Sequence, residues 1–256
     1  MDTTYLLNNN ENMRICIGQT SAQKGNIEKN IEQHKELLKI AVRRNADIMI
    51  FPELSLTGYE PELAKELATT QNDKRLDVFQ VISNMNKMTI GVGLPTKENG
   101  NVCISMIIFQ PDKERITYSK QHLYPTEVGY FIPGQKQVYL NVGDSIVAPT
   151  ICYELSNPEH SKKASENKAD IYIASVLNSI GGVDSDIEKL SAIALKYKMT
   201  VFMANYIGQS GGYQCAGKTS VWNNEGTLIG QLGRKNEGVL IFDTETREVI
   251  EELIQS

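Results

Sequence analysis

The sequence predicts a layered fold of mixed α/β class, in which helices cover β-sheets. Residues 13–18 form a short apolar strand, residues 26–44 carry apolar side chains at helical spacing, and residues 46–51 (ADIMIF) form a second buried strand. A strand, a long helix and a second strand make a unit typical of parallel sheets covered by helices. Residues 169–175 (ADIYIAS) resemble the second strand, which hints at a repeat of this unit.

Further helices and strands follow without a linker. The turn at 98–101 indicates an antiparallel hairpin of strands 89–94 and 101–110. Apolar residues Val78, Val81, Ile82 and Met85 share one face of a helix at 76–87. Other expected helices are 61–68, about 158–167 and 186–198, and other expected strands are 114–118, 137–140, 145–149, 200–205, 218–222, 227–232 and 239–243.

Domain organisation follows from the same patterns. Because no linker divides the chain, we expect residues 13–256 to form a single domain. Residues 1–12 (MDTTYLLNNNEN) lack the basic start, apolar centre and cleavage site of a signal peptide, and we expect them to form a flexible tail.

Composition argues against several classes of partner. The net charge is −5 and no block of Lys or Arg occurs, so we expect neither nucleic acid nor membrane as a partner. No apolar run approaches the length of a membrane span. The 4 cysteines show no CxxC spacing, which indicates reduced thiols and a cytoplasmic location.

The stretch from Ser145 to Glu159 (SIVAPTICYELSNPE) places a cysteine between two elements. We expect a buried strand that ends at Pro149, a turn that contains Cys152, and a helix that starts near Asn157 or Pro158. A thiol in such a turn is accessible and has backbone N–H groups near it, as a nucleophile requires. The alternative is a small buried apolar residue at the end of a strand, and this stretch alone favours that alternative.

Two other stretches carry residues that can react. Glu53 follows the second strand among apolar residues, where burial would raise the pKa of its carboxyl and make it a useful general base. A structural ion pair or a cap for the following turn is the other interpretation of Glu53. Residues 119–134 (SKQHLYPTEVGYFIPG) form an irregular loop that contains Lys120 and Glu127, and such loops often carry function.

Together these stretches resemble the nitrilase superfamily of carbon-nitrogen hydrolases. The motifs are FPELSLTGY around Glu53, YSKQHLYPTE around Lys120 and Glu127, and TICYE around Cys152, in the order Glu, Lys, Cys. The resemblance covers residues 13–243 and includes GKTSVWNNEG near Lys218. It implies a four-layer α-β-β-α sandwich and a homodimer or a higher homo-oligomer.

The resemblance also implies roles for the residues of these motifs. Cys152 would be the nucleophile, Glu53 the general base, Lys120 the third catalytic residue and Glu127 a second glutamate beside them. The expected reaction is hydrolysis of a non-peptide C–N bond of a small amide or N-carbamoyl substrate through a cysteine thioester, with release of ammonia or amine and without a cofactor. The alternatives are nitrile hydrolysis, acyl transfer to an amine, and a catalytically silent interaction protein.

Residues that bind substrate are expected at several strand ends. By the logic of the fold, the loop 177–185 and several tyrosines would line the pocket. The candidate substrate-binding residues are Tyr59, Tyr124, Tyr130, Tyr153 and Asn178.

Two sequence features bear on metals and on the branch of the family. His122 and His160 with Cys152 could suggest a metal site, but zinc ligands usually occur at tighter spacing, so we expect no metal. Many family members carry an Arg-Ala-x-Glu-Asn-like run where this chain has residues 193–197 (IALKY). This departure leaves the branch and the substrate open.

Overall fold

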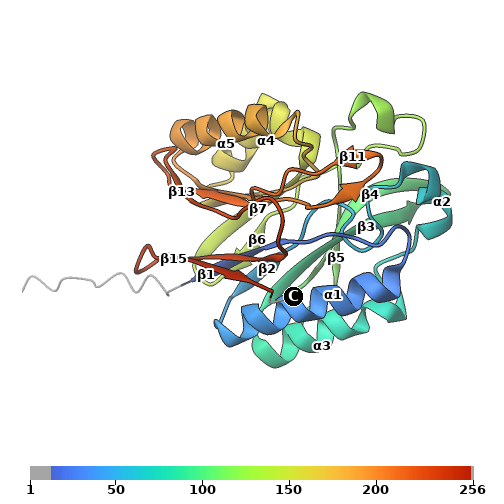
Figure 1. The fold of residues 1–256 in the computed structure, drawn as a ribbon, viewed down its shortest axis with the longest axis horizontal. Coiled ribbons are helices and arrows are strands. Elements are labelled where there is room, and N and C mark those ends of the chain that lie inside the picture. Colours follow the sequence, from blue (N-terminus) through green and yellow to red (C-terminus); the bar gives the residue numbers. More distant parts are fainter. Residues whose placement is uncertain (1–12, 255–256) are drawn as a thin grey trace, which may run out of the picture.

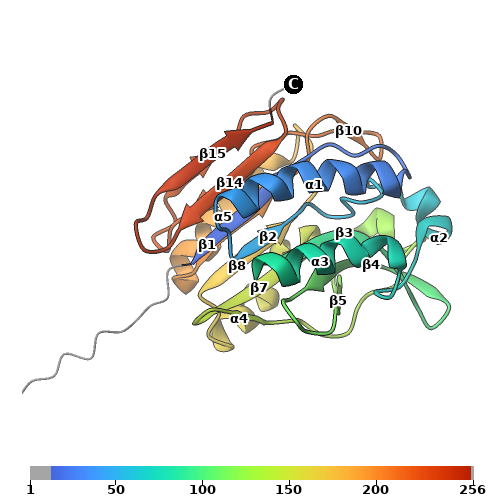
Figure 2. The same ribbon diagram turned by 90° about the horizontal axis from the view of Figure 1, so that it is seen from below.

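The computed structural model describes residues 13–254 and shows four layers (Figure 1). From top to bottom in Figure 1, helices α4 and α5 cover a six-stranded sheet, which packs on a seven-stranded sheet that α1 and α3 cover from below. Figure 2 shows α1 and α3 lying side by side across the outer face of the seven-stranded sheet. The predicted α-β-β-α sandwich is therefore confirmed, whereas the predicted tail, residues 1–12, lies outside the described residues.

The seven-stranded sheet has the order β15-β14-β1-β2-β3-β4-β5. Strands β1 to β3 are parallel to one another, and β3 and β4 form the predicted antiparallel hairpin. The bounds are β1 Arg14–Gln19, β2 Ile48–Ile50, β3 Thr89–Glu98, β4 Asn101–Phe109, β5 Ile116–Ser119, β14 Gly238–Asp243 and β15 Val249–Leu253.

The six-stranded sheet has the order β13-β12-β9-β8-β7-β6. Its central strands β7, β8 and β9 are parallel, so the similar segments β2 and β8 each lie in the middle of a parallel trio. The bounds are β6 Leu140–Val142, β7 Ser145–Ile151, β8 Ile171–Ser175, β9 Thr200–Ala204, β12 Ser220–Trp222 and β13 Leu228–Gln231; a separate two-stranded ribbon consists of β10 Gln209–Ser210 and β11 Tyr213–Gln214.

The helices match the predicted segments closely. Helix α1 begins where predicted, because the side chain of Asn26 accepts a hydrogen bond from the backbone N–H of Lys29. Asn157 caps α4 in the same way through Glu159 N. The α-helices are α1 Ile27–Arg43, α2 Ala64–Leu67, α3 Asp77–Asn86, α4 Pro158–Glu166 and α5 Val183–Tyr197, and the 3-10 helices are η1 Pro61–Leu63, η2 Lys74–Leu76, η3 Pro125–Glu127 and η4 Cys152–Ser156.

Alternation along the strands builds the core between the sheets. In β1, Ile15 and Ile17 pack in the cluster between the two sheets, while Cys16 belongs to the cluster under α1. From the other sheet, Ile173 and Phe202 fill the same inner layer. Each sheet thus buries both faces, one against its partner sheet and one against helices.

Several details differ from the predictions. The strand expected at 137–140 runs over Leu140–Val142, the helix expected at 186–198 begins at Val183, and β15 was not among the expected strands. Strand β7 continues through Pro149 to Ile151. A proline fits there because β6 pairs only with Ser145–Val147, so the β6 edge of β7 needs no N–H donor at Pro149. In α3 the buried residues are Phe79 and Ser83, whereas Val81 and Met85 are 53% and 78% exposed.

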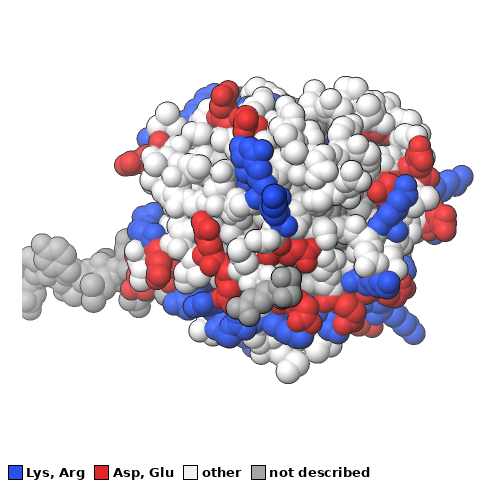
Figure 3. Space-filling view, viewed as in Figure 1, with Lys and Arg blue, Asp and Glu red and all other residues white. Residues whose placement is uncertain are grey.

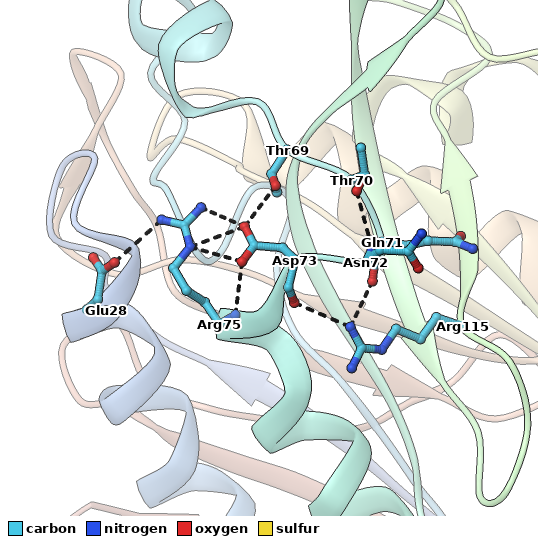
Figure 4. A network of polar contacts seen from close by, with 8 residues as sticks. All are labelled: Glu28, Thr69, Thr70, Gln71, Asn72, Asp73, Arg75 and Arg115. Carbon is cyan, nitrogen blue, oxygen red and sulfur yellow. Dashed lines mark hydrogen bonds and ion pairs between the residues drawn. The ribbon is translucent and has the colours of Figure 1, made fainter.

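Polar contacts fix the connection from α2 to α3, which Figure 4 shows. Asp73 accepts hydrogen bonds from the side chain of Arg75 and from Thr69 Oγ1 at 2.8 Å. Arg115, which precedes β5, donates to the carbonyl oxygen of Gln71 at 2.8 Å and so ties this connection to the edge of the sheet.

The surface carries charges of both signs. On the face shown in Figure 3, Lys and Arg side chains are interspersed with Asp and Glu side chains along the lower edge, over α1 and α3. Within residues 13–254, none of the helices is both long enough and apolar enough to cross a membrane.

Candidate active site

The backbone presents Cys152 in a turn between β7 and α4. Cys152 follows the last residue of β7, adopts a left-handed conformation with φ of 46°, and begins the 3-10 helix η4. A positive φ is costly for a residue with a Cβ, so this turn is strained, as functional turns often are. Cys152 is partly exposed, whereas Cys16, Cys103 and Cys215 are free and buried.

Glu53 follows β2 and lies at the end of the opposite sheet. Its carboxylate is buried, and the next residue, Leu54, has a φ of 53°. The turn fits only because β3 has a glycine beside it, since a Cβ on Gly93 would lie 2.3 Å from Leu54 N. Ser175 at the end of β8 donates to the Phe51 carbonyl at 2.7 Å, which joins the carboxyl ends of the two parallel trios.

Lys120 extends from the end of β5 into the same place. Its backbone N–H donates to Ile104 O at 2.8 Å, and its side chain is fully buried. The ammonium donates to Glu53 Oε1 at 2.7 Å and to Glu127 Oε1 at 2.8 Å. Glu127 also accepts from the Tyr59 hydroxyl at 2.8 Å, so the four side chains form one buried network.

Burial sets the protonation of Glu53. It raises the pKa of the Glu53 carboxyl to about 7, although the Lys120 ammonium and the neighbouring Cys152 thiol oppose the rise. Within the described residues, Glu53 Oε2 is buried without a hydrogen-bond partner. A carboxylate oxygen that is unpartnered and titrates near neutral pH can accept a proton at little cost.

The nucleophile and the cation respond to the same surroundings. Burial, and then the Glu53 charge, raise the pKa of the Cys152 thiol well above its usual value, so the resting group is a thiol. Burial opposes the charge on Lys120, but Glu53, Cys152 and Glu127 together raise the pKa of its ammonium above its usual value. Lys120 is therefore a permanent cation beside the thiol.

A third buried glutamate, Glu154, binds the backbone next to both Lys120 and Cys152. It accepts from Gln121 N and from Ile151 N, each at 2.6 Å, and from the Tyr118 hydroxyl at 2.5 Å. His160 Nε2 lies 2.9 Å from that hydroxyl, and burial lowers the pKa of His160 to about 3, so this imidazole is neutral.

A cavity of about 290 Å³ opens at Cys152. Of the candidate substrate-binding residues, Tyr59, Tyr124, Tyr153 and Asn178 line it, whereas Tyr130 is not among the lining residues and is 46% exposed. Eight further residues line the cavity, and none of them was predicted individually from the sequence, although four belong to the predicted loop 177–185. They are Ser156, Leu177, Ser179, Gly182, Ser185, Asp186, Lys189 and Tyr213. Asp186 and Lys189 are one helical turn apart on α5, which is the only sequence signal that could have paired them.

The histidines have other partners. His122 Nε2 lies 2.7 Å from the side-chain nitrogen of Asn157, and His160 Nδ1 lies 2.8 Å from the Tyr172 hydroxyl. In residues 13–254 no group of three His, Cys, Asp or Glu side chains is placed to bind a metal ion.

The site thus consists of a buried Glu-Lys-Glu network beside a cysteine at one cavity. A comparison of the sequence with family models is consistent with this site. Residues 14–252 match the model of the carbon-nitrogen hydrolases. The chain belongs to the carbon-nitrogen hydrolase family.

Individual relatives of this carbon-nitrogen hydrolase are distant. It is 24% identical over 247 residues to the glutamine-dependent NAD(+) synthetase of Thermotoga maritima, covering 92% of this chain and 42% of the synthetase. It is 24% identical over 212 residues to the 2-oxoglutaramate amidase of Bacillus subtilis, covering 81% and 82% of the two chains. The chain therefore spans less than half the length of the synthetases that it matches.

Solved structures share the fold of this hydrolase. A cysteine-to-alanine mutant of the amidase from Nesterenkonia sp. AN1, in complex with butyramide, superimposes with a TM-score of 0.83 at 22% identity and covers 92% of each chain. A glutamate-to-leucine mutant of that amidase shows covalent addition of the acetamide moiety of fluoroacetamide at the active site cysteine, with a TM-score of 0.83, 23% identity and 90% of each chain covered.

Proposed function

We propose that this enzyme hydrolyses a non-peptide C–N bond of a small amide or N-carbamoyl compound through a thioester on Cys152. The observation that carries the proposal is the buried Glu53–Lys120–Glu127 network at the cavity where Cys152 is the accessible cysteine. The Nesterenkonia amidase that takes covalent addition at its active site cysteine supports the assignment of a cysteine nucleophile.

The first half of the reaction forms the thioester. Cys152 Sγ attacks the carbonyl carbon, and its proton passes to Glu53 Oε2, the oxygen with no other described partner. The carbonyl oxygen becomes an oxyanion, which the Lys120 ammonium and the backbone N–H of Tyr153 stabilise. The C–N bond then breaks, Glu53 returns the proton to the departing nitrogen, and ammonia or an amine leaves.

The second half releases the acid. Glu53 takes a proton from a water molecule, and the hydroxide attacks the thioester carbon. A second oxyanion forms at the same donors, the C–S bond breaks, and Glu53 protonates the Cys152 thiolate. Glu127 accepts from Lys120 and Tyr59 throughout and so keeps the ammonium in place.

Labelling of the thiols tests the proposal. We expect a thiol-reactive amide such as fluoroacetamide to label Cys152 fastest, because the other three cysteines are buried, and peptide mass spectrometry locates the label. Cys152→Ala should lose both the label and release of ammonia from small amides, whereas Cys215→Ala should keep both. Equal labelling of all four cysteines, or ammonia release by folded Cys152→Ala, would contradict the assignment.

Nitrile hydrolysis and acyl transfer to an amine would use the same groups, so a product screen separates them. Amides, N-carbamoyl amines and nitriles are offered in parallel, with and without hydroxylamine as an acyl acceptor. Location and assembly stay predictions: the cytoplasm and a homodimer, for which light scattering should give twice the chain mass.

A further inference from the structure

The cavity at Cys152 has polar lining residues that the proposed reaction does not use. Tyrosines Tyr59, Tyr124, Tyr153 and Tyr213 form an aromatic part of its lining. Three hydroxyls and one ion pair lie among the remaining lining residues: Ser156, Ser179, Ser185, Asp186 and Lys189. A small pocket with a few convergent polar groups selects its ligand through those groups.

Lys189 connects two of these polar lining residues. Its ammonium donates to Ser156 Oγ at 3.0 Å and to Asp186 Oδ1 at 2.9 Å. Ser156 ends the 3-10 helix that begins at Cys152, so the ammonium is anchored to the element that carries the thiol. An ammonium has three N–H donors, and the two described partners leave one for a ligand.

Lys189 is the described lining residue that offers a positive charge to an anionic group. Among the described lining residues, Glu53, Glu127 and Asp186 carry carboxyl groups and Lys189 carries the positive charge. Lys120 is fully buried, its ammonium already binds Glu53 and Glu127, and in the proposed reaction its remaining N–H serves the carbonyl oxygen at Cys152. A carboxylate on a substrate therefore has one exposed cation to approach, with the Ser156 hydroxyl as a second donor.

The ion pair of Lys189 and Asp186 differs from an ordinary surface ion pair of this chain. Lys162 and Glu159 on α4 have the same i,i+3 spacing, and their side chains are 51% and 60% exposed. Lys189 and Asp186 are 42% and 16% exposed, and both line the cavity. The carboxylate of Asp186 thus fixes the ammonium at the cavity wall.

We infer that the preferred substrate is a primary amide whose far end carries a carboxylate, which Lys189 and Ser156 bind. This inference rests on amide hydrolysis at Cys152. The shared chemistry is the carboxylate, and it can come from a plain dicarboxylic acid monoamide or from an amino acid ω-amide. In the second source an α-ammonium would lie against Asp186.

Three amides of equal chain length test the inference. Pentanamide has no charge, glutaramate replaces its terminal methyl by a carboxylate, and glutamine adds an α-ammonium to glutaramate. For the wild-type enzyme we expect kcat/KM for glutaramate or glutamine to exceed that for pentanamide by at least about tenfold, the ratio that one charge-assisted hydrogen bond supplies.

Variants assign the preference to Lys189. Lys189→Met should lower the ratio of kcat/KM for the carboxylate amide to that for pentanamide by about tenfold, mainly through KM. Lys162→Met, which removes the matched lysine on α4, should leave the ratio at the wild-type value. Asp186→Asn distinguishes the two sources, because it should weaken turnover of glutamine more than that of glutaramate only if the α-ammonium binds there.

The outcomes also separate this inference from the proposed function. Turnover of pentanamide equal to or faster than that of both carboxylate amides overturns the inference and leaves amide hydrolysis intact. So does a Lys189→Met variant that changes all three substrates by the same factor. Absence of turnover with every amide, in a folded protein that Cys152-directed reagents do not label, overturns both.

Discussion

At the scale of single residues, the protonation of Glu53 decides whether the site can start a reaction. Its pKa is raised to about 7, first by burial, so the carboxyl is protonated below this pH and cannot accept the thiol proton. We therefore expect kcat/KM to rise with pH through about 7 and to level off above it. A series of initial rates of ammonia release between pH 5 and 9 measures this rise, the acid limb of the pH profile.

Two variants show which titrating group causes the acid limb. Glu53→Gln cannot take a proton, so its residual rate should lack the limb. His122 is a group of the same loop as Lys120 that could titrate nearby, although burial lowers its pKa. His122→Asn should keep the limb, and its loss in that variant would move the assignment from Glu53 to His122.

The charge on Lys120 affects both the rate and the pKa of the base. Lys120→Met keeps much of the side-chain volume and removes the donor, so we expect turnover to fall by about 10²–10³, the cost of losing one oxyanion donor. Because Lys120 lowers the pKa of Glu53, the limb in the residual activity should also move to higher pH. Circular dichroism and a melting curve show whether the variant is folded, and full turnover in a folded variant would contradict the role.

At the scale of elements, Glu154 connects the segment of Lys120 to the segment of Cys152. Its carboxylate accepts from Gln121 N, Ile151 N and the Tyr118 hydroxyl. In Glu154→Gln one of these donors would face an amide N–H₂, which leaves a buried donor unpaired at a cost of about 1–3 kcal/mol. We expect Tm to fall by roughly 3–10 °C and kcat to fall at least about tenfold, with KM for the amide little changed.

A positioning role and a purely structural role differ in this experiment. Glu159→Gln, at an exposed carboxylate of the next helix, should change neither Tm nor kcat. A Glu154→Gln variant with a lowered Tm but the wild-type kcat would show that the carboxylate supports the fold alone.

Sequence patterns predicted most elements but not how each one faces its neighbours. The apolar stripe of α3 named Val81 and Met85, yet the helix buries Phe79, which packs near His34 and Phe109. Strand β15 was missed because Val249–Leu253 (VIEEL) contains two consecutive glutamates and pairs only with β14 at the sheet edge. These facts depend on neighbours from distant parts of the chain, which local patterns do not contain.

In the site, too, local motifs predicted some features, and others depend on distant parts of the chain. The motifs around Glu53, Lys120 and Cys152 named the residues that the structure brings together at the cavity, because each follows a strand end. The sequence shows no reason for a glycine at position 93, because a Cβ there would meet the backbone of Leu54 in the turn after β2, a distant part of the chain. Lys189 was passed over for a similar reason, because a helix lysine is recognised as part of a cavity only when the opposite wall is known.

At the scale of the whole molecule, the active site needs both sheets, so we expect the sandwich to unfold as one unit. The layers share one apolar core, and buried polar contacts join them. Ser175 donates to Phe51 O at 2.7 Å, and Gln19 Oε1 accepts from Thr219 N at 3.0 Å. Differential scanning calorimetry should show one transition with a calorimetric enthalpy close to the van't Hoff enthalpy.

Ser175→Ala tests the link between the sheets within that transition. Without the Ser175 hydroxyl, the Phe51 carbonyl loses this hydrogen bond, which should lower the free energy of unfolding by about 1–3 kcal/mol. The Tm should fall, and the calorimetric trace should keep a single peak. Because the bond joins the strand ends next to Glu53, turnover should fall at temperatures where the protein is still folded. Two separate peaks in the wild-type protein would contradict the predicted single domain and would mean that one sheet survives while the pairing of Glu53 with Cys152 is lost.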